Sequence, residues 1–394
     1  MMMNKKLGIY IHIPFCVKKC NYCDFLSFPA DEDIQKKYIE ALIQEMDNQK
    51  LENDYIVNTV FIGGGTPSIL KGSFADSIFM ALRKKFKISE TAEITMECNP
   101  GTVSKDNLLL YRSLGVNRLS FGLQSADNYE LSLLGRIHTW EDFLTSFDMA
   151  REAGFCNINI DLMSAIPAQT PESYEKTCEK VLALQPEHIS AYSLIVEEGT
   201  PFYENYKDNP PVSEKTDRLL YAKTKEILQQ KGYHRYEISN YAKKGYECAH
   251  NIKYWSREEY LGLGLGASSL LGKYRLKNVS DMNTYLMLNS PDEKQQSDAK
   301  IVEQTGRKKS CYEEIELLDK KDEMSEYMFL GLRKMEGVSE IEFQKLFGKS
   351  ISEVYPGICQ RLIDVGLLKR NKGLYSLTEK GIDISNYVMS EFIL

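Results

Sequence analysis

The sequence lacks several features that would place it in a special class of protein. No stretch approaches the ~18 consecutive apolar residues that a transmembrane helix needs. The N-terminal residues contain neither a long apolar run nor a small-residue cleavage site, so we expect no secretion signal. Glycine (25) and proline (12) are not in excess among 394 residues, of which 43% are hydrophobic. This composition excludes a disordered, collagenous or low-complexity chain.

Basic residues are not in excess either. The 49 lysines and arginines face 56 aspartates and glutamates, which gives a net charge of −7. We therefore expect no bulk electrostatic binding to nucleic acid. The nine cysteines are an odd number, and without a secretion signal they are expected to remain thiols in a cytoplasmic protein.

Short apolar segments alternate with amphipathic segments through the first half of the chain. The expected strands are residues 8–13, 59–63, 93–97, 118–122, 157–162 and 188–194. The expected helices include residues 34–48, 74–86 and 104–114, and a segment that starts at Thr139 and ends at Gly154. This alternation predicts a parallel α/β sheet, curved or barrel-like, with its chemistry at the C-terminal ends of the strands.

The pattern changes after Leu194, which suggests three parts: a core at residues 1–195, a region with a linker at 196–310, and a C-terminal unit at 311–394. From about Glu314 onward helices are expected, followed by a strand pair at residues 367–370 and 374–377. Helices with such a hairpin indicate a small winged-helix-like unit, which we expect to serve packing rather than nucleic-acid binding.

Three cysteines stand close together in the loop after the first expected strand. Cys16, Cys20 and Cys23 have C-x3-C-x2-C spacing, so three thiolates can converge on one centre. A closed structural zinc site wants four protein ligands, and no fourth cysteine or histidine follows at motif spacing. Three thiolates on a cubane iron–sulfur cluster leave one iron open for a small ligand. The spacing therefore favours a cluster over zinc or unrelated thiols.

This spacing resembles that of the radical S-adenosylmethionine (SAM) superfamily. Tyr22 precedes the third cysteine, and a Gly-Gly-Gly-Thr-Pro segment at residues 63–67 follows the second expected strand. Further segments, at residues 10–16, 97–100, 122–125, 134–136 and 161–163, resemble the oxygen-independent coproporphyrinogen III oxidase-like family. The resemblance implies a partial (β/α)6 TIM-like barrel with a small, mostly helical winged-helix-like C-terminal domain.

The resemblance also implies a [4Fe-4S] cluster on Cys16, Cys20 and Cys23, with SAM bound to the remaining iron. The residues that it places around SAM are Tyr10, Gly65, Thr66, Pro67, Glu97, Gln124, Arg136 and Asp161. Their chemistry suits the ligand, because carboxylates can hold ribose hydroxyls or an ammonium group and Arg136 can pair with a carboxylate.

Two departures indicate the group within the family. The residue two positions after Cys23 is Phe25, where coproporphyrinogen dehydrogenases have a further cysteine, and only 15 residues precede Cys16. Both features resemble the heme-chaperone group. That group also shares an H-N-x-x-Y-W segment, present here at residues 250–255. The resemblance implies heme binding there, with His250 as an axial ligand and Tyr254 and Trp255 as flat apolar walls. The alternative is a hydrogen-bonded histidine with two core aromatics.

The resemblance therefore implies a heme chaperone that binds a [4Fe-4S] cluster, SAM and heme and delivers heme to apo-hemoproteins. An electron donor for the cluster is a further expected partner. The alternatives are oxidative decarboxylation of coproporphyrinogen III propionates and radical chemistry on an unrelated substrate. Whether SAM is cleaved stays open, as does peripheral membrane contact, which depends on where the heme recipients lie.

Overall fold

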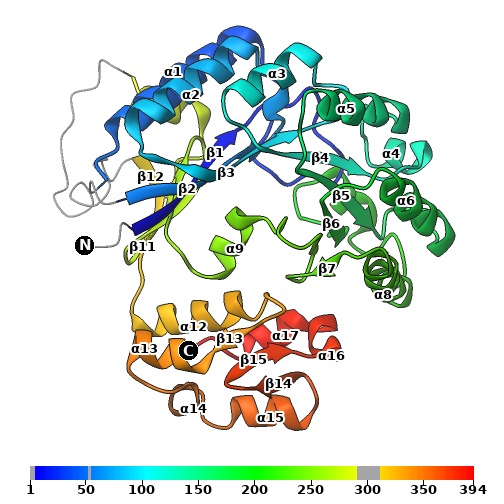
Figure 1. Cartoon of the computed structure of the whole chain (residues 1–394), viewed down its shortest axis with the longest axis vertical. Helices are drawn as coiled ribbons and strands as arrows, with labels where there is room; N and C mark the ends of the chain where they lie inside the picture. Colours follow the sequence, from blue (N-terminus) through cyan, green and yellow to red (C-terminus); the bar gives the residue numbers. More distant parts are fainter. Residues whose placement is uncertain (1–4, 52–54, 291–310) are drawn as a thin grey trace.

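The computed structural model describes residues 5–51, 55–290 and 311–394 (Figure 1). Within these residues the chain forms a 12-stranded sheet of order β12-β11-β10-β9-β1-β2-β3-β4-β5-β6-β8-β7 and a three-stranded sheet of order β13-β15-β14. The first six strands are β1 (Lys5–Ile13), β2 (Tyr55–Gly64), β3 (Ile88–Cys98), β4 (Arg118–Gln124), β5 (Ile158–Ser164) and β6 (His188–Ser193). All six strands expected from the sequence are thus present.

These six strands run parallel, and each pairs with the next one along the chain. The helices that cover their outer face are α1 (Glu32–Asn48), α2 (Gly72–Lys85), α3 (Lys105–Ser113), α4 (Asn128–Leu133), α5 (Trp140–Glu152), α6 (Pro171–Ala183) and α8 (Glu214–Gln230) (Figure 1). Thr139 and Asp142 form a reciprocal capping box at the start of α5, the helix that the sequence predicted to begin at Thr139.

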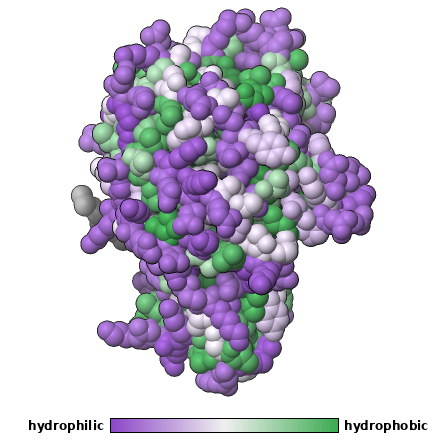
Figure 2. Space-filling view, turned by 90° about the vertical axis from the view of Figure 1, so that its right-hand side faces the viewer, coloured by the Kyte–Doolittle hydropathy of each residue, from purple (hydrophilic) through white to green (hydrophobic). Residues whose placement is uncertain are grey.

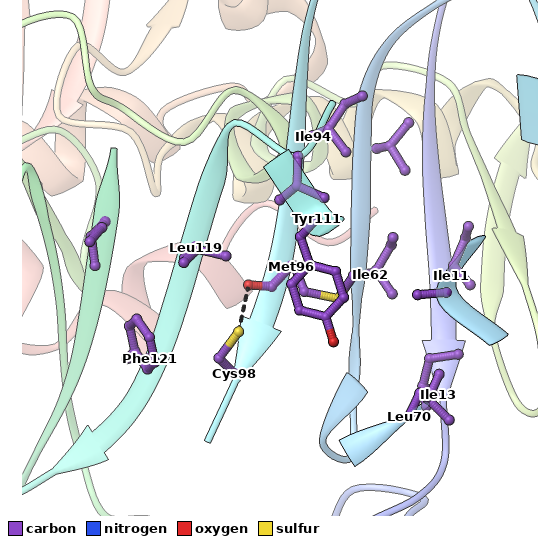
Figure 3. Packing of buried hydrophobic residues seen from close by; sticks show 14 of the residues in the cluster. Ile11, Ile13, Ile62, Leu70, Ile94, Met96, Cys98, Tyr111, Leu119 and Phe121 are labelled. Carbon is purple, nitrogen blue, oxygen red and sulfur yellow. Dashed lines mark hydrogen bonds between the residues drawn. The ribbon is translucent and has the colours of Figure 1, made fainter. Parts of the chain in front are cut away.

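The alternation of side-chain direction along the strands separates the apolar core from the inner face of the sheet. Figure 3 shows Ile11, Ile62, Met96 and Leu119, from four successive strands, packed in one apolar layer with Tyr111 of α3. Because successive side chains of a strand point to opposite faces, the residues between them point to the inner face of the sheet. Glu97, which follows Met96, is one of these inward residues.

The sheet continues beyond the six parallel strands on both sides. The added strands are β9 (Tyr260–Leu263), β10 (Ser268–Leu271), β11 (Tyr274–Asn278), β12 (Tyr312–Leu317), β7 (His234–Arg235) and β8 (Asn240–Ala242). The two outer strands, β12 and β7, do not pair with each other among the described residues, so the barrel is open, as expected for a partial barrel. The linker was expected at the end of the region 196–310, in the polar and charged segment 290–309, and this segment lies almost entirely outside the described residues.

The C-terminal unit has its own apolar core, which runs from Met324 to Phe392. Its elements are α12 (Lys320–Gly331), β13 (Val338–Ser339), α13 (Glu340–Phe347), α14 (Ile351–Val354), α15 (Ile358–Asp364), β14 (Leu368–Asn371), β15 (Leu374–Leu377), α16 (Glu379–Asp383) and α17 (Ser385–Ser390). The expectation of a helix from about Glu314 is wrong, because β12 occupies that segment. The unit forms the narrower lower part of the molecule, with polar and apolar side chains interspersed (Figure 2).

Three short helices complete the part of the chain that the structure describes: α7 (Pro201–Tyr206), α9 (Ala249–Trp255) and α10 (Met282–Leu288). Helix α9 lies between the large sheet and α12 of the C-terminal unit (Figure 1). No helix of the described residues is both long and apolar enough to cross a membrane.

Candidate functional site

The three clustered cysteines lie in the loop that follows β1. The backbone N–H of Cys16 donates to the carbonyl of Phe28 at 3.2 Å, and that of Cys23 donates to the carbonyl of Cys20 at 3.3 Å. These bonds fold the loop back on itself. All three thiols are free, and all three line one cavity of about 310 Å³. The structure therefore brings the expected cluster ligands together.

The arrangement of the thiols bears on which metal group they fit. Among the described residues, no three His, Cys, Asp or Glu side chains converge as closely as one metal ion requires. A cubane cluster needs wider spacing, because its cysteines bind different iron atoms. Burial raises the pKa of the Cys16 thiol, and the nearby thiols of Cys23 and Cys20 raise it further. A raised pKa makes it harder for a thiol to lose its proton, as it must to bind a metal. Bound iron would offset this by stabilising the thiolate. The three free thiols that line one cavity thus suit an iron–sulfur cluster, in which each would bind a different iron atom.

The glycine-rich segment after β2 packs directly against the cysteine loop. The N–H of Gly65 donates to the Ile13 carbonyl at 2.8 Å, and that of Thr66 donates to the Phe15 carbonyl at 2.7 Å. A Cβ on Gly65 would collide with the Phe15 carbonyl oxygen, so this close approach of two backbones requires glycine. Thr66 lines the cavity, whereas Pro67 is buried at the start of the 3-10 turn η1 (Pro67–Ile69) and does not reach it.

Two carboxylates point into the same cavity from neighbouring parts of the sheet. Glu97 accepts a hydrogen bond from the N–H of Gly64 at 2.9 Å, and Asp161 accepts one from the Asn159 amide at 2.7 Å. Burial raises the pKa of Glu97 to about 8, with a further contribution from Asp161. Burial also raises the pKa of Asp161. Such a pair attracts a cationic ligand, because positive charge would restore both carboxylates to the ionised form.

Arg136 connects the carboxylate end of the cavity to the cysteine loop. Its Nη1 lies 3.6 Å from the Cys20 sulfur, and its Nη2 donates to Asn99 Oδ1 at 2.8 Å and to the Gly122 carbonyl at 2.5 Å. Its Nε is buried and has no hydrogen-bond partner among the described residues. Arg136 therefore carries a positive charge beside the thiols and keeps one donor for a ligand.

Two other polar residues at this site did not stand out in the sequence. The Asn99 amide donates to Thr66 Oγ1 at 2.7 Å, which places it between Thr66 and Arg136. The Tyr192 hydroxyl donates to Gln124 Oε1 at 2.9 Å, and Gln124 holds a left-handed backbone with φ of 73°. Both Asn99 and Tyr192 lie at or just after the end of a strand, and that position was the signal available in the sequence.

The outcome for the expected SAM residues is mixed. Six of the eight line this first cavity: Gly65, Thr66, Glu97, Gln124, Arg136 and Asp161. Tyr10 points instead to an adjoining cavity, where its hydroxyl lies 2.9 Å from His12 Nδ1.

The adjoining cavity is larger, with a volume of about 620 Å³. Tyr254 and Trp255, from the end of α9, line it together with side chains of the large sheet and of α12. Phe25, Gly64 and Glu97 line both cavities, so the two meet at this wall. The other apolar and aromatic residues that line this second, larger cavity include Tyr260, Leu265, Leu270, Phe329 and Leu330.

His250 does not line this cavity. Its side chain is buried, with Nδ1 2.9 Å from Thr59 Oγ1 and Nε2 2.8 Å from the Tyr254 hydroxyl. Burial lowers the pKa of His250 to about 3, so the ring is neutral. The sequence led us to expect a histidine with a nitrogen available to iron. The structure brings Tyr254 and Trp255 to the cavity, but both nitrogens of His250 are engaged elsewhere.

Helix α9 is held in place by a carboxylate from the large sheet. Glu93 of β3 accepts hydrogen bonds from the N–H groups of Ala249 at 2.9 Å and His250 at 3.0 Å. These donors belong to the first turn of α9, where backbone N–H groups have no partner within the helix. Glu93 therefore fixes the start of α9 against the sheet and with it the position of Tyr254 and Trp255.

Comparison with known proteins identifies this architecture. Residues 10–181 match the family model of the radical SAM superfamily, and residues 318–384 match that of the HemN C-terminal domain. The fold is similar to that of coproporphyrinogen III oxidase (HemN) from Escherichia coli, with a TM-score of 0.83 and 23% sequence identity. That match covers 99% of this chain and 90% of the other. The fold and the cysteine-lined cavity thus define a radical SAM protein.

Curated relatives give the particular family. The heme chaperone HemW of Bacillus subtilis is 36% identical over 98% of both chains. That of Lactococcus lactis is 35% identical over 100% of this chain and 99% of its own, and that of Escherichia coli is 39% identical over 66% and 69%. The chain belongs to the HemW family, which confirms the resemblance predicted from its sequence.

Proposed function

We propose that this protein is a heme chaperone with two adjoining ligand sites. The first cavity holds a [4Fe-4S] cluster and SAM, and the second holds heme, which the protein delivers to apo-hemoproteins. One observation carries the proposal: a cavity with three thiols and buried charges shares the wall of Phe25, Gly64 and Glu97 with a larger cavity lined by aromatic side chains. The names of the HemW relatives support the same function.

In the first cavity the three cysteines would hold the cluster, and the polar residues would hold SAM. SAM carries a carboxylate, an ammonium group and ribose hydroxyls, for which Arg136, Glu97 and Asp161 provide complementary charge. The bound cluster and SAM would supply a redox centre, so an electron donor belongs to the same proposal.

In the second cavity the side chains suit a flat, apolar ligand. Its volume of about 620 Å³ falls within the range of roughly 300–1,000 Å³ typical of small-molecule sites. Tyr254 and Trp255 offer ring surface for a macrocycle, and Phe329 and Leu330 of α12 line the same space. Because α12 belongs to the C-terminal unit, displacement of that unit would open the cavity for heme transfer.

The test is an anaerobic titration of the full-length, cluster-reconstituted protein with hemin, followed by absorbance. Saturable binding near one heme per chain is expected, with transfer to apomyoglobin when that acceptor is added. Trp255→Leu should weaken binding. Trp140→Leu serves as the matched control, because Trp140 packs against Phe143 on the outer helix α5. Absence of saturable binding, together with conversion of coproporphyrinogen III, would replace this proposal with oxidative decarboxylation.

A further inference from the structure

A cluster of charged side chains closes one side of the second cavity. Arg275 of β11 donates to Glu326 Oε1 of α12 through Nη2 at 2.6 Å and through Nε at 3.2 Å. Arg257 donates through Nε to the other oxygen, Oε2, at 2.7 Å. The Glu326 side chain is only 10% exposed. One carboxylate of the C-terminal unit is therefore shared by two arginines of the preceding part of the chain, which carries the 12-stranded sheet and is called the large domain below.

Arg257 has more donors than this carboxylate can satisfy, whereas Arg275 also donates through Nη1 to the Tyr260 hydroxyl at 3.3 Å. Arg257 Nη2 is buried and lacks a hydrogen-bond partner among the described residues, although Glu323 Oε1 lies 3.6 Å away. Arg257 also holds a left-handed backbone with φ of 53°, which is unfavourable for a residue other than glycine. Trp255 Nε1, on the cavity wall, is another buried donor with no partner in the described part of the chain. This group of side chains thus retains two buried N–H donors, on Arg257 and Trp255, that could bind a further anionic acceptor.

The chemistry of heme matches this excess of donors. Heme is flat and apolar but carries two propionate carboxylates on one edge. Among the described residues that line the second cavity, Arg275 is the one lysine or arginine. Arginine can bind a carboxylate through two parallel hydrogen bonds. Here Nε and Nη2 of Arg275 share a single oxygen of Glu326, so a propionate that used both of its oxygens would fit this arginine better than Glu326 does.

We propose that Arg275 is the anchor for a heme propionate, and that the propionate takes the place of Glu326 on it. This inference rests on the proposed function. Because Glu326 belongs to α12, the exchange couples heme binding to release of the C-terminal unit from the large domain. Glu326 thus keeps the arginine occupied while heme is absent and competes with heme for it.

The experiment compares two variants that remove the same ion pair from opposite sides. The full-length, cluster-reconstituted protein and its Arg275→Gln and Glu326→Gln variants are titrated with hemin and with hemin dimethyl ester, which lacks free carboxylates. Arg275→Gln should weaken hemin binding about tenfold, the usual worth of a charge-assisted hydrogen bond to a carboxylate. Glu326→Gln should tighten it about threefold, because the competing charge is gone.

The ester should bind the wild type and both variants alike. Lys277→Gln is the matched control, since Lys277 lies on the same strand and pairs with Glu314 at 3.0 Å outside the cavity. If both variants weaken hemin binding, the ion pair between Arg275 and Glu326 only stabilises the structure of the cavity, and the inference is overturned. If hemin binds saturably and with the same affinity to the wild type and both variants, the inference is also overturned, but the proposed chaperone function is not. If the wild type binds no hemin saturably, both proposals fail.

Discussion

His250 Nε2 lies 2.8 Å from the hydroxyl oxygen of Tyr254, one turn further along α9. Since Nδ1 lies 2.9 Å from Thr59 Oγ1, the imidazole joins a strand of the large sheet to a residue of the second cavity wall. The burial that lowers the pKa of His250 to about 3 keeps the ring neutral throughout the physiological range. In this geometry His250 acts on the cavity by holding Tyr254 rather than by facing a ligand.

Replacing His250 should therefore have the same effect on heme binding as removing the Tyr254 hydroxyl. His250→Ala leaves buried hydroxyls without a partner, so it should lower the free energy of unfolding by about 1–3 kcal/mol. Hemin affinity should fall to a similar degree in His250→Ala and Tyr254→Phe, without a pH dependence between pH 5 and 8 from this ring. Denaturant unfolding and hemin titrations measure both effects. A change of the heme ligand spectrum in His250→Ala alone would show instead that the histidine binds iron.

The raised pKa of Glu97 predicts a specific dependence of stability on pH. Its pKa is about 8 in the folded protein, against an ordinary value of 4.5. Between these values the folded state binds a proton that the unfolded state has lost, so stability should fall as pH rises. The slope from this group is at most about 1.4 kcal/mol per pH unit. Denaturant unfolding of the apoprotein at pH 5 to 8 should show this fall, and Glu97→Gln should flatten it.

The matched control is Glu90→Gln, because Glu90 lies exposed on the same strand. Its stability should follow the wild type at every pH. A constant difference between the wild type and Glu97→Gln across the range would contradict the assignment of the pKa to Glu97.

The core of this fold was predictable because local patterns determine it. The alternation of short apolar segments with amphipathic segments predicted all six parallel strands, and the resemblance to the radical SAM superfamily pointed to six residues that line the first cavity. The segment Tyr312–Leu317 misled the prediction, because three of its six residues are glutamates, which favour helices. In the structure it is an edge strand, where outward charges are tolerated and discourage further pairing.

The second cavity was not predictable in the same way, because it depends on contacts between distant segments. Thr59 and His250 are 191 positions apart, and Arg275 meets Glu326 across the boundary between the large sheet and the C-terminal unit. The H-N-x-x-Y-W spacing indicated a functional segment, but nothing local fixes which side chain reaches a cavity. Packing of α9 against β2 and β3 decides that Tyr254 reaches the cavity and His250 does not.

Each cysteine of the first cavity should be needed for the cluster. Cys16→Ser, Cys20→Ser and Cys23→Ser should each lower the iron and sulfide content after anaerobic reconstitution, because a serine hydroxyl is a poor substitute for a thiolate. Cys156→Ser is the control, since Cys156 is an exposed free cysteine outside the cavity. Iron analysis and the visible absorbance of the cluster give the result. Full iron content in any one of the three variants would remove that cysteine from the ligand set.

Arg136 should control SAM affinity without holding the cluster. Its guanidinium contacts the Cys20 sulfur, Asn99 and the Gly122 carbonyl at once, and a lysine ammonium cannot reproduce this fork. Arg136→Lys should keep its iron content but bind SAM about tenfold more weakly, as expected for the loss of a charge-assisted contact. Calorimetry on the reconstituted protein measures the affinity, and Arg112→Lys on α3 is the control. Unchanged SAM affinity would mean that the arginine serves the cysteine loop alone, whereas loss of iron would place its role at the cluster.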